Sequence, residues 1–301
     1  MKKKDALHGV NVAFIGAGAM GTAMIGGVLS RPASDASKIT ASDRHQERLD
    51  SVRDQFGIQT TLDNTLAAKT AQVIVLSVKP QVLPGVLAEL RGHVQSGAVV
   101  ISIVAGATVR CIATGLGHEA IVRTMPNTPA QVGEGMTVWT ATPEVSETQR
   151  TQAHALVAAL GQQLFVEDEA FLDIATAISG SGPGYVFLMM EALIDAAVHL
   201  GCSRVDAREL VIQTIRGSAI YAQQQHVHPA ELRNRVTSPG GTTAEALYQL
   251  EKGSFRTVVS KAVNAAYQRS VELGVISTEK VEARALTRER LAKAKNAKTE
   301  K

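Results

Sequence analysis

The sequence is poor in residue types that mark several classes of protein. It holds two cysteines in 301 residues, Cys111 and Cys202, and their separation matches no metal-ligand spacing. We interpret both as reduced thiols, which is typical of a cytoplasmic protein. No run approaches the roughly 18 consecutive apolar residues of a membrane span. Lysines at residues 2–4 lead into a strand rather than into the apolar region of a signal peptide. We expect a cytoplasmic protein with no membrane partner.

Charge of one sign is also scarce over most of the chain. The formal net charge is +3, but residues 280–301 carry eight Lys and Arg against three Glu, so the remainder is nearly neutral. Aromatic residues make up 4% of the sequence, and no basic patch is interleaved with them. Because nucleic-acid surfaces combine both features, we expect no nucleic-acid partner. The basic tail is interpreted as a solvated helix.

The histidines show no metal-site spacing, so no metal is expected. His226 and His228 are close together, but they precede Pro229 at the start of a predicted helix. Capping of that helix is the better explanation for them.

What the sequence does contain is an alternation of short apolar runs and helical segments over its first half. Nearly continuous apolar runs are typical of strands that are buried on both faces. Strands alternating with helices predict an α/β fold with a Rossmann-like, doubly wound parallel sheet. Strands are expected at residues 10–15, 38–42, 73–78, 98–103 and 120–124, edge strands at 136–140 and 163–166, and helices at 20–29, 46–56 and 147–160.

After about residue 170 the strand signal fades, and an all-α region is expected. Its helices are predicted at residues 183–200, 203–224, after Pro229, and at 243–250 and 254–273. The first is apolar all round except for Glu191, Asp195 and His199. Such a helix must be buried on most sides, so a second subunit is expected to cover part of it. We predict a dinucleotide-binding domain at residues 1–168 and a helical dimerisation and substrate domain at 169–301.

Residues 16–21 form a G-x-G-x-x-G motif directly after the first strand and at the start of a helix. In that context the first glycine permits the tight turn, the second admits the pyrophosphate, and the third lets helix and strand pack closely. The helix N-terminus then offers N–H groups to the phosphates. A glycine-rich turn without a ligand is the alternative. The motif predicts a nicotinamide dinucleotide at Gly16, Ala17, Gly18, Ala19, Met20 and Gly21.

The end of the second strand decides between the two nicotinamide cofactors. An acidic residue there accepts a hydrogen bond from the ribose of NADH, whereas a hydroxyl and a guanidinium receive the 2′-phosphate of NADPH. The segment supplies both kinds of group. We expect Asp43 to turn outward, so that Ser42 and Arg44 can flank a phosphate. We therefore expect NADPH, with NADH as the alternative.

Two further segments end strands at the carboxyl edge of the sheet, where ligands bind in this fold. In residues 77–80, Lys79 either lies near the cofactor or caps the strand in solvent. In residues 104–106, Gly106 would let the backbone approach the nicotinamide.

A second turn of small residues occurs at 237–243, Thr-Ser-Pro-Gly-Gly-Thr-Thr, and feeds a helix N-terminus. Backbone N–H groups at such a turn can bind a carboxylate-sized anion without Arg or Lys. Ordinary N-capping by Thr242 or Thr243 explains the same pattern. The residues alone leave both interpretations open.

Five segments, taken in order, resemble pyrroline-5-carboxylate reductase. They are Phe-Ile-Gly-Ala-Gly-x-Met-Gly, Val-Lys-Pro, Met-Pro-Asn-Thr-Pro at 125–129, Ser-Gly-Ser-Gly-Pro and Thr-Ser-Pro-Gly-Gly-Thr-Thr. The resemblance runs through about residues 10–275. It implies an NAD(P)H-dependent oxidoreductase that reduces the C=N bond of 1-pyrroline-5-carboxylate to L-proline, the last step of proline biosynthesis. It also implies homodimers that can assemble further, up to a decamer.

The resemblance assigns roles by position. Thr243 matches the family threonine that hydrogen-bonds the ring nitrogen, and is the one catalytic residue implied. At Arg235 some members carry asparagine, although an arginine there can still meet a cofactor phosphate. The implied substrate-binding residues are Glu169, Val236, Ser238, Gly240, Gly241, Thr242, Thr243, Met125 and Asn127. The further cofactor-binding residues are Ser42, Arg44, Asn64, Ser77, Val78, Lys79, Pro80, Val104, Ala105, Gly106 and Arg235.

Two other functions compete with this one. A 3-hydroxyacid dehydrogenase shares the glycine motif but needs a base, usually a lysine on an interdomain helix. The corresponding helix of this chain, at residues 183–200, contains no lysine. A redox-sensing regulator would bind the dinucleotide without turnover and would carry a degraded substrate turn, whereas residues 238–243 are intact. If both loops serve one reaction, the helical domain has to bring residues 238–243 to the carboxyl edge of the sheet.

Overall fold

The computed structural model describes residues 5–32 and 34–299. The chain forms two compact units. The first holds the residues up to Gly180 together with those from Ala266 onward, and the second is Ser181–Ala265. The domain boundary predicted after residue 168 lies where the strand signal of the sequence fades. The two units are defined by packing instead, so they do not test that boundary, and it stays a prediction.

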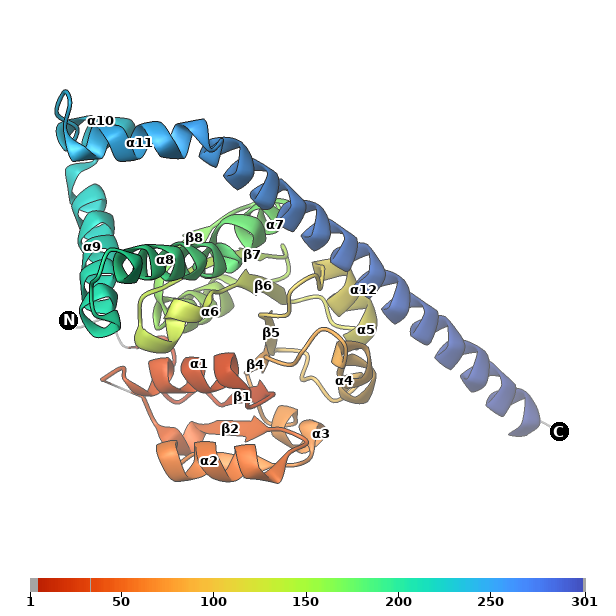
Figure 1. The fold of residues 1–301 in the computed structure, drawn as a ribbon. Coiled ribbons are helices and arrows are strands. Elements are labelled where there is room, and N and C mark those ends of the chain that lie inside the picture. Colours follow the sequence, from red (N-terminus) through yellow and green to blue (C-terminus); the bar gives the residue numbers. More distant parts are fainter. Residues whose placement is uncertain (1–4, 33, 300–301) are drawn as a thin grey trace. The chain divides into compact units, whose positions relative to one another are not determined.

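A sheet of eight strands, as counted over the described residues, lies at the centre of the first unit (Figure 1). Its order is β3-β2-β1-β4-β5-β6-β7-β8, and the neighbours are parallel except for β6 and β7. The strand order reverses beside β1, and dinucleotides bind at such a switch point. The strands are β1 (Val12–Ile15), β2 (Ile39–Ser42), β3 (Gln59–Thr61), β4 (Val73–Leu76), β5 (Val99–Ser102), β6 (Ile121–Met125), β7 (Gly135–Ala141) and β8 (Gly161–Phe165).

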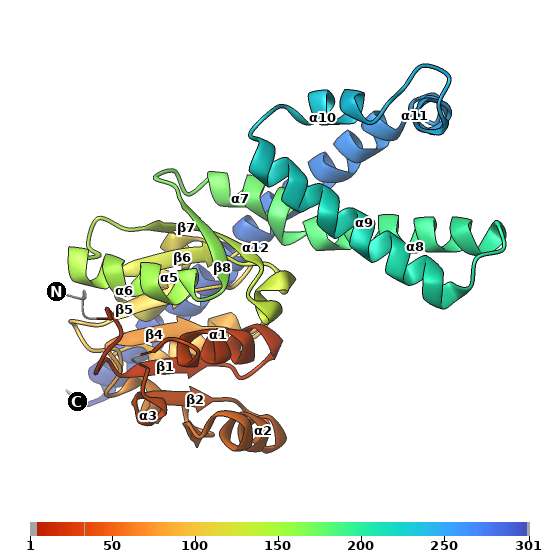
Figure 2. The ribbon, with the colours of Figure 1, turned by 90° about the vertical axis from the view of Figure 1, so that its left-hand side faces the viewer.

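Helices cover both faces of this sheet (Figure 2). They are α1 (Ala19–Leu29), α2 (Gln46–Phe56), α3 (Asn64–Ala68), α4 (Leu83–Leu90), α5 (Val109–Leu116), α6 (Glu147–Ala158) and α7 (Phe171–Ala175), with short turns η1 (Ala36–Lys38), η2 (Thr128–Val132) and η3 (Thr176–Gly180). Successive strand residues face opposite sides. Phe14 therefore joins the core under α1, α2 and α6, whereas Ile15 joins the core under α3, α4 and α5. Burial on both faces explains the unbroken apolar runs.

The structure confirms the predicted doubly wound α/β fold and corrects one detail of it. The prediction of an edge strand at residues 136–140 is wrong, because β7 lies between β6 and β8. The chain passes from β6 to β7 through the short turn η2 rather than a helical crossover, so β7 runs antiparallel to β6.

The second unit is all-α over its described residues, as predicted. It contains α8 (Gly182–His199), α9 (Arg204–Gln225), α10 (Pro229–Arg235), α11 (Thr242–Lys252) and the start of α12 (Phe255–Thr299). Helices α8 and α9 lie side by side (Figure 2), joined at Gly201, whose φ is +96°. His228 Nδ1 accepts from the Ala230 N–H at 3.1 Å, which confirms capping of α10 by this histidine.

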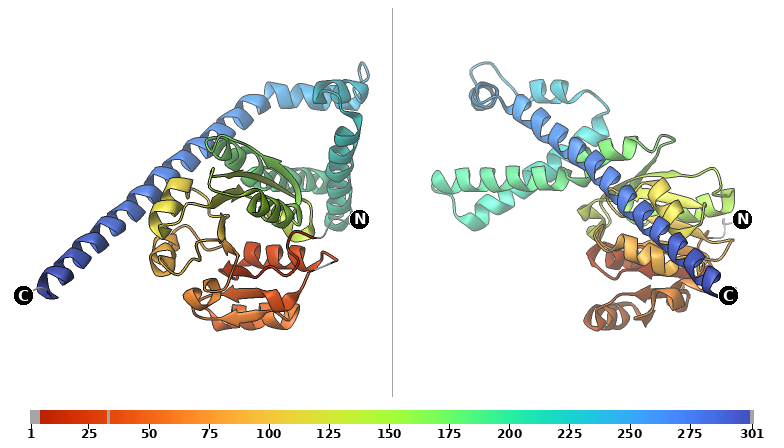
Figure 3. Two further views of the ribbon diagram at one scale, coloured as in Figure 1. Left: turned by 180° about the vertical axis from the view of Figure 1, so that it is seen from behind. Right: turned by 90° about the vertical axis from the view of Figure 1, so that its right-hand side faces the viewer.

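The last helix is much longer than predicted. An end near residue 273 is wrong, because α12 continues without a break to Thr299. Its later part belongs to the first unit and lies beside α4 and α5 (Figure 3). Val281 in this part is 3% exposed. Up to residue 288, the last whose side chain the structure describes, the basic tail is therefore partly packed against the protein rather than solvated all round.

Candidate cofactor and substrate sites

The predicted glycine loop connects β1 to α1 at the switch point of the sheet. Gly16 has φ of +109°, a backbone conformation that would be strained in any residue with a side chain. Its N–H donates to the Ser42 carbonyl at 2.7 Å. A Cβ atom on Gly21 would clash with the Gly16 carbonyl oxygen, so this glycine lets α1 begin close to β1. The loop thus has the tight turn and the close packing that a dinucleotide motif requires.

Gly18 opens the start of α1 to a ligand. A Cβ atom placed on Gly18 would meet nothing within 4 Å, so the position faces open space. Gly18 is also the N-cap of α1 and, as a glycine, supplies no side-chain oxygen to the first-turn N–H groups. These donors and the positive end of the helix dipole suit a pyrophosphate. The residues present therefore fit the phosphates of a dinucleotide.

A cleft of about 670 Å³ extends from this loop past the ends of β2 and β4 to α4. The predicted cofactor-binding residues on its lining are Gly16, Ala17, Gly18, Ala19, Ser42, Arg44, Asn64, Ser77, Val78 and Lys79. Among the described residues, the lining does not include Met20, Gly21, Pro80, Val104, Ala105 or Gly106. It adds residues that the motifs do not predict, namely Asp43, Arg48, Val82, Gly85, Val86 and Glu89.

The prediction that Asp43 turns outward is wrong. Its Oδ2 accepts from the Ala17 N–H of the glycine loop at 3.0 Å. Its Oδ1 accepts from the His45 N–H at 3.0 Å and lies 2.9 Å from the ring Nδ1 of that histidine. Burial alone would raise the pKa of Asp43, but the hydrogen bonds from His45 and Ala17 outweigh it and lower the pKa. The carboxylate is thus ionised and bound within the protein. Its Oδ2 also lies 3.5 Å from Arg48 Nη1, and both Arg44 and Arg48 lie on the cleft lining.

Hydrogen bonds fix the orientation of Asn64 in the cleft. Ser42 Oγ donates to Asn64 Oδ1 at 2.8 Å, and Asn64 Nδ2 donates to Glu89 Oε2 at 3.0 Å. Glu89 comes from α4, and no motif in the sequence marks it. The chain of contacts therefore ties the end of β2 to the helix that forms the opposite wall of the cleft.

Glu169, predicted to contact the substrate, lies in a charged network of the first unit. Arg123 of β6, whose side chain is 5% exposed, donates to Glu169 Oε1 at 2.7 Å. The same oxygen accepts from the Val109 N–H at 2.7 Å. Arg123 Nη2 also lies 3.8 Å from Asp173 Oδ1, which accepts from Ser270 Oγ at 2.6 Å. The network joins β6, α5, α7 and α12, and a substrate contact of Glu169 stays a prediction.

Met125 and Asn127 lie at the end of β6 and just beyond it. Asn127 Nδ2 donates to the Ser179 carbonyl at 3.1 Å, and its Oδ1 accepts from the Met136 N–H at 2.9 Å. Both ends of the amide are therefore used in holding the β6–β7 connection to η3. The substrate contacts predicted for Met125 and Asn127 stay predictions.

The second predicted turn lies in the second unit, between α10 and α11. Gly240 has φ of +67°, and the Gly241 N–H donates to the Ser238 carbonyl at 3.1 Å. Gly241 is the N-cap of α11, and Thr242 and Thr243 are its first two helical residues. The alternative interpretation, N-capping by one of these threonines, is therefore wrong. A glycine cap leaves the first-turn N–H groups available to an anion.

Arg235 and Val236 come just before this turn. Arg235 donates to Glu231 Oε1 at 2.6 Å and to Gln225 Oε1 at 3.2 Å. Val236 is 63% exposed. Arg235 is thus bound to side chains of its own unit, and its contact with a cofactor phosphate stays a prediction.

The fold and the glycine loop together define a class of protein. A doubly wound sheet with a dinucleotide turn at its switch point is typical of nicotinamide-dependent oxidoreductases. Residues 11–106 match the family model described as NADP oxidoreductase, coenzyme F420-dependent. The chain is an NAD(P)H-dependent oxidoreductase.

Comparison with known proteins identifies the family. Residues 169–273 match the model for pyrroline-5-carboxylate reductase dimerisation. The pyrroline-5-carboxylate reductase of Synechocystis is 40% identical over 265 residues, which cover 88% of this chain and 98% of that protein. That of Pseudomonas aeruginosa is 42% identical over 263 residues, covering 87% and 96%. The chain belongs to the pyrroline-5-carboxylate reductase family, which confirms the resemblance.

Solved structures of the family agree with the fold. A pyrroline-5-carboxylate reductase of Coxiella burnetii has a TM-score of 0.81 at 38% identity, covering 88% of this chain and 98% of that one. The Plasmodium falciparum pyrroline carboxylate reductase with NADP bound has a TM-score of 0.81 at 33% identity, covering 89% and 99%. The NADP-bound relative and the NADP oxidoreductase model support NADPH as the cofactor, as predicted.

One helical run, Phe171–His199, is long and apolar enough to cross a membrane by length and composition, with a mean hydropathy of 1.2. The buried core helix of a soluble protein passes the same test, whereas this window is only 6% buried in the single chain. This run lies entirely within the residues that match the dimerisation model, so self-association explains its apolar surface. No group of three or more potential metal ligands occurs in the part of the chain that the structure describes.

Proposed function

We propose that the chain reduces 1-pyrroline-5-carboxylate to L-proline with NADPH as the hydride donor, the last step of proline biosynthesis. The observation that carries this proposal is the glycine-capped start of α11, where Thr242 and Thr243 follow directly within the helix. An anion site and a hydroxyl next to it suit a small ring that carries one carboxylate and one nitrogen.

The substrate carboxylate would bind at the N-terminus of α11. First-turn N–H groups and the helix dipole attract a single negative charge without a Lys or Arg side chain. Ser238, Gly240, Gly241 and Thr242 would surround the carboxylate, because they form the turn and the first helical residue. The Thr243 hydroxyl, one residue further, would hydrogen-bond the ring nitrogen.

The reaction requires correct orientation of the substrate ring more than it requires a strong acid. The protonated imine carbon is already electrophilic, and the nitrogen keeps its proton as the C=N bond becomes a C–N bond. NADPH supplies the hydride when bound. The chain has to hold the ring by its carboxylate and its nitrogen, which fixes the face that accepts the hydride. The competing reaction, oxidation of a 3-hydroxy acid, needs a base that is usually a lysine. Helix α8 contains no lysine within its described residues.

The adenosine end of NADPH would bind between β2 and α2. Ser42, Arg44 and Arg48 line the cleft there, and two guanidinium groups suit a 2′-phosphate. Asp43, the acidic residue that would favour NADH, is already bound to Ala17 and His45. This commitment supports the choice of NADPH.

We also infer that the chain forms a homodimer through its helical domain, with assembly of dimers into a decamer as a further step. Phe187 and Leu188 of α8 are 59% and 67% exposed in the single chain, and a second copy would cover them. A cytoplasmic location is supported by Cys111 and Cys202, which are both free thiols.

Incubation of the protein with NADPH and 1-pyrroline-5-carboxylate tests the proposed reaction. We expect the absorbance of reduced nicotinamide to fall and L-proline to form in equal amount. A 3-hydroxy acid with NADP⁺ serves as the control and should give no reduced cofactor. Binding of NADPH without any imine-dependent oxidation would overturn the proposal and favour a regulator.

A further inference from the structure

The last helix continues beyond the part of the chain that the family shares. The matching family models begin at residue 11 and end at residue 273. The alignment with the Pseudomonas relative covers 96% of that protein but 87% of this chain. Helix α12 nevertheless runs on without a break. We define the C-terminal extension as residues 274–288, the part of this continuation whose side chains the structure describes.

The extension begins against the loop that follows β5, within the first unit. A Cβ atom on Gly106 would lie 2.8 Å from Leu273 Cβ, so the loop and the helix approach each other through their backbones. One turn later, Thr278 Oγ1 lies 3.1 Å from Thr108 Oγ1. Thr108 is also the N-cap of α5. These contacts fix the segment that leads from the predicted nicotinamide loop into α5.

Val281 anchors the middle of the extension. Its side chain is 3% exposed and belongs to the core on the α4 and α5 face of the sheet. Gly115 of α5 makes room for it, because a Cβ atom there would lie 3.1 Å from Val281 Cγ1. Glu282, the next residue, pairs with Arg110 at 2.8 Å on the surface. The apolar contact, rather than the exposed ion pair, is expected to hold the extension in place.

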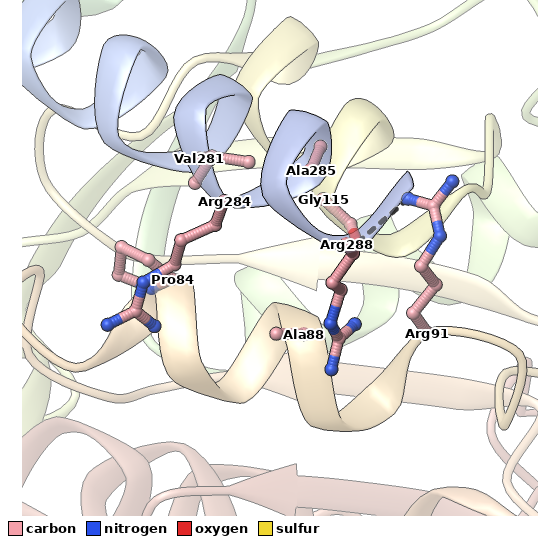
Figure 4. Close-up of a pocket in the computed structure, with 8 residues that line it drawn as sticks. All are labelled: Pro84, Ala88, Arg91, Gly115, Val281, Arg284, Ala285 and Arg288. Carbon is pink, nitrogen blue, oxygen red and sulfur yellow. Dashed lines mark hydrogen bonds between the residues drawn. The ribbon is translucent and has the colours of Figure 1, made fainter. Parts of the chain in front are cut away.

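Helix α4 lies between the extension and the cofactor cleft. Gly85 and Glu89 line the cleft, whereas Pro84 and Ala88 line a small pocket against the extension, of about 60 Å³ (Figure 4). Arg284 of the extension also borders this pocket, and its Nη1 lies 3.6 Å from the Cβ position of Gly85. The helix that forms one wall of the cleft is therefore supported from behind by the extension.

We propose that the C-terminal extension positions the cofactor cleft. It holds α4 and the segment at residues 106–108 in the arrangement that binds NADPH, and its side chains act through packing rather than by touching the cofactor. The inference rests on the proposed function only in taking NADPH as the ligand of the cleft. A basic tail that is merely a solvated helix would have no such effect.

The replacement Val281→Asp tests this inference in the full-length protein. A charge in the buried position should undock the extension, and Leu286→Asp places the same charge at a residue of the extension that is 57% exposed. The dissociation constant of NADPH is measured by calorimetry without substrate. If the wall keeps its binding arrangement about one tenth of the time, this constant rises about tenfold. We expect that rise for Val281→Asp, wild-type affinity for Leu286→Asp, and near wild-type affinity for the conservative variant Val281→Ile.

Cys111 reports independently whether the extension has undocked. Its Sγ donates to the Ser277 carbonyl at 3.6 Å, and burial raises the pKa of this thiol to about 11. Undocking should therefore accelerate labelling of Cys111 by a thiol reagent. Accelerated labelling with unchanged NADPH affinity would overturn the inference. If Val281→Asp leaves the labelling of Cys111 slow, a chain that stops after Leu273 removes the extension altogether. Wild-type NADPH affinity in that shortened chain would also overturn the inference. Loss of imine reduction with normal NADPH binding would count against the proposed function instead.

Discussion

Thr243 is the second residue of α11 and offers its hydroxyl to the substrate in the proposed reaction. Thr243→Ala removes one hydrogen bond that is formed to the transition state. We expect kcat/KM for the imine to fall about 10- to 100-fold while NADPH affinity is retained. Steady-state kinetics with each substrate varied in turn measure both quantities. Thr243→Ser keeps the hydroxyl and should retain most of the activity, and wild-type turnover by the alanine variant would remove Thr243 from the mechanism.

Whether a residue can play its predicted role depends on the direction in which its side chain points. Asp43 stands at the position where an acid favours NADH, but its carboxylate points back to the glycine loop. Asn127 is held by Ser179 and Met136 on its two sides. A sequence gives the type of residue at a position, whereas the direction of its side chain depends on partners from distant segments.

At the scale of elements, Arg123 joins β6 to three helical segments. Its side chain is 5% exposed and pairs with Glu169 at 2.7 Å. Arg123→Met would leave that carboxylate and Asp173 without their buried cation. Because Arg123 is buried but Glu169 is 33% exposed, we expect a loss of about 2 kcal/mol in the free energy of unfolding, below that of a fully buried pair. Urea denaturation at a fixed protein concentration measures it.

The matched control for this change is Arg269→Met. Arg269 pairs with Glu272 at 2.9 Å, and both side chains are 60% exposed. An exposed pair contributes about 0–1 kcal/mol, so this variant should unfold close to the wild-type midpoint. Equal losses in the two variants would show that burial of Arg123 does not set its contribution.

The elements carried by strong periodicity could be predicted from the sequence. Burial on both faces and glycine turns leave clear patterns in a sequence. These patterns predict the apolar strands, the glycine loop, the helix α2 and the all-α second unit. The antiparallel direction of β7 was not, since it depends on the short connection η2. Arg48 and Glu89 reach the cofactor cleft from helices, where the packing of the helix decides which residues face the ligand.

The continuation of α12 does leave a weak signal. Small or apolar residues recur at 274, 278, 281 and 285, which is a helical spacing along one face. The surrounding Lys, Arg and Glu residues obscure it, and a single buried valine does not distinguish a packed helix from a solvated one. Structure is needed because the partner of that face, α5, lies more than 150 residues earlier in the chain.

At the scale of the whole molecule, the exposed apolar face of α8 predicts the oligomeric state. Phe187→Glu places a charge at a position that the proposed dimer would bury, so dimers should dissociate. Leu62→Glu is the control, because both side chains are 59% exposed in the single chain and residue 62 lies outside the dimerisation match. Light scattering after size exclusion should give masses of twice or ten times 31.8 kDa for the wild type and the control. A wild-type mass for Phe187→Glu would place the interface elsewhere.

The inward turn of Asp43 has a consequence for anyone who wishes to redesign this enzyme for the cheaper cofactor, NADH. An acid at the end of β2 favours NADH when its carboxylate binds the ribose hydroxyls of the cofactor. Here the carboxylate accepts the hydrogen bond of Ala17, so its replacement would weaken the glycine turn before it altered the choice between cofactors. A redesign has to begin at the two arginines of the cleft, Arg44 and Arg48, and leave the acid in place.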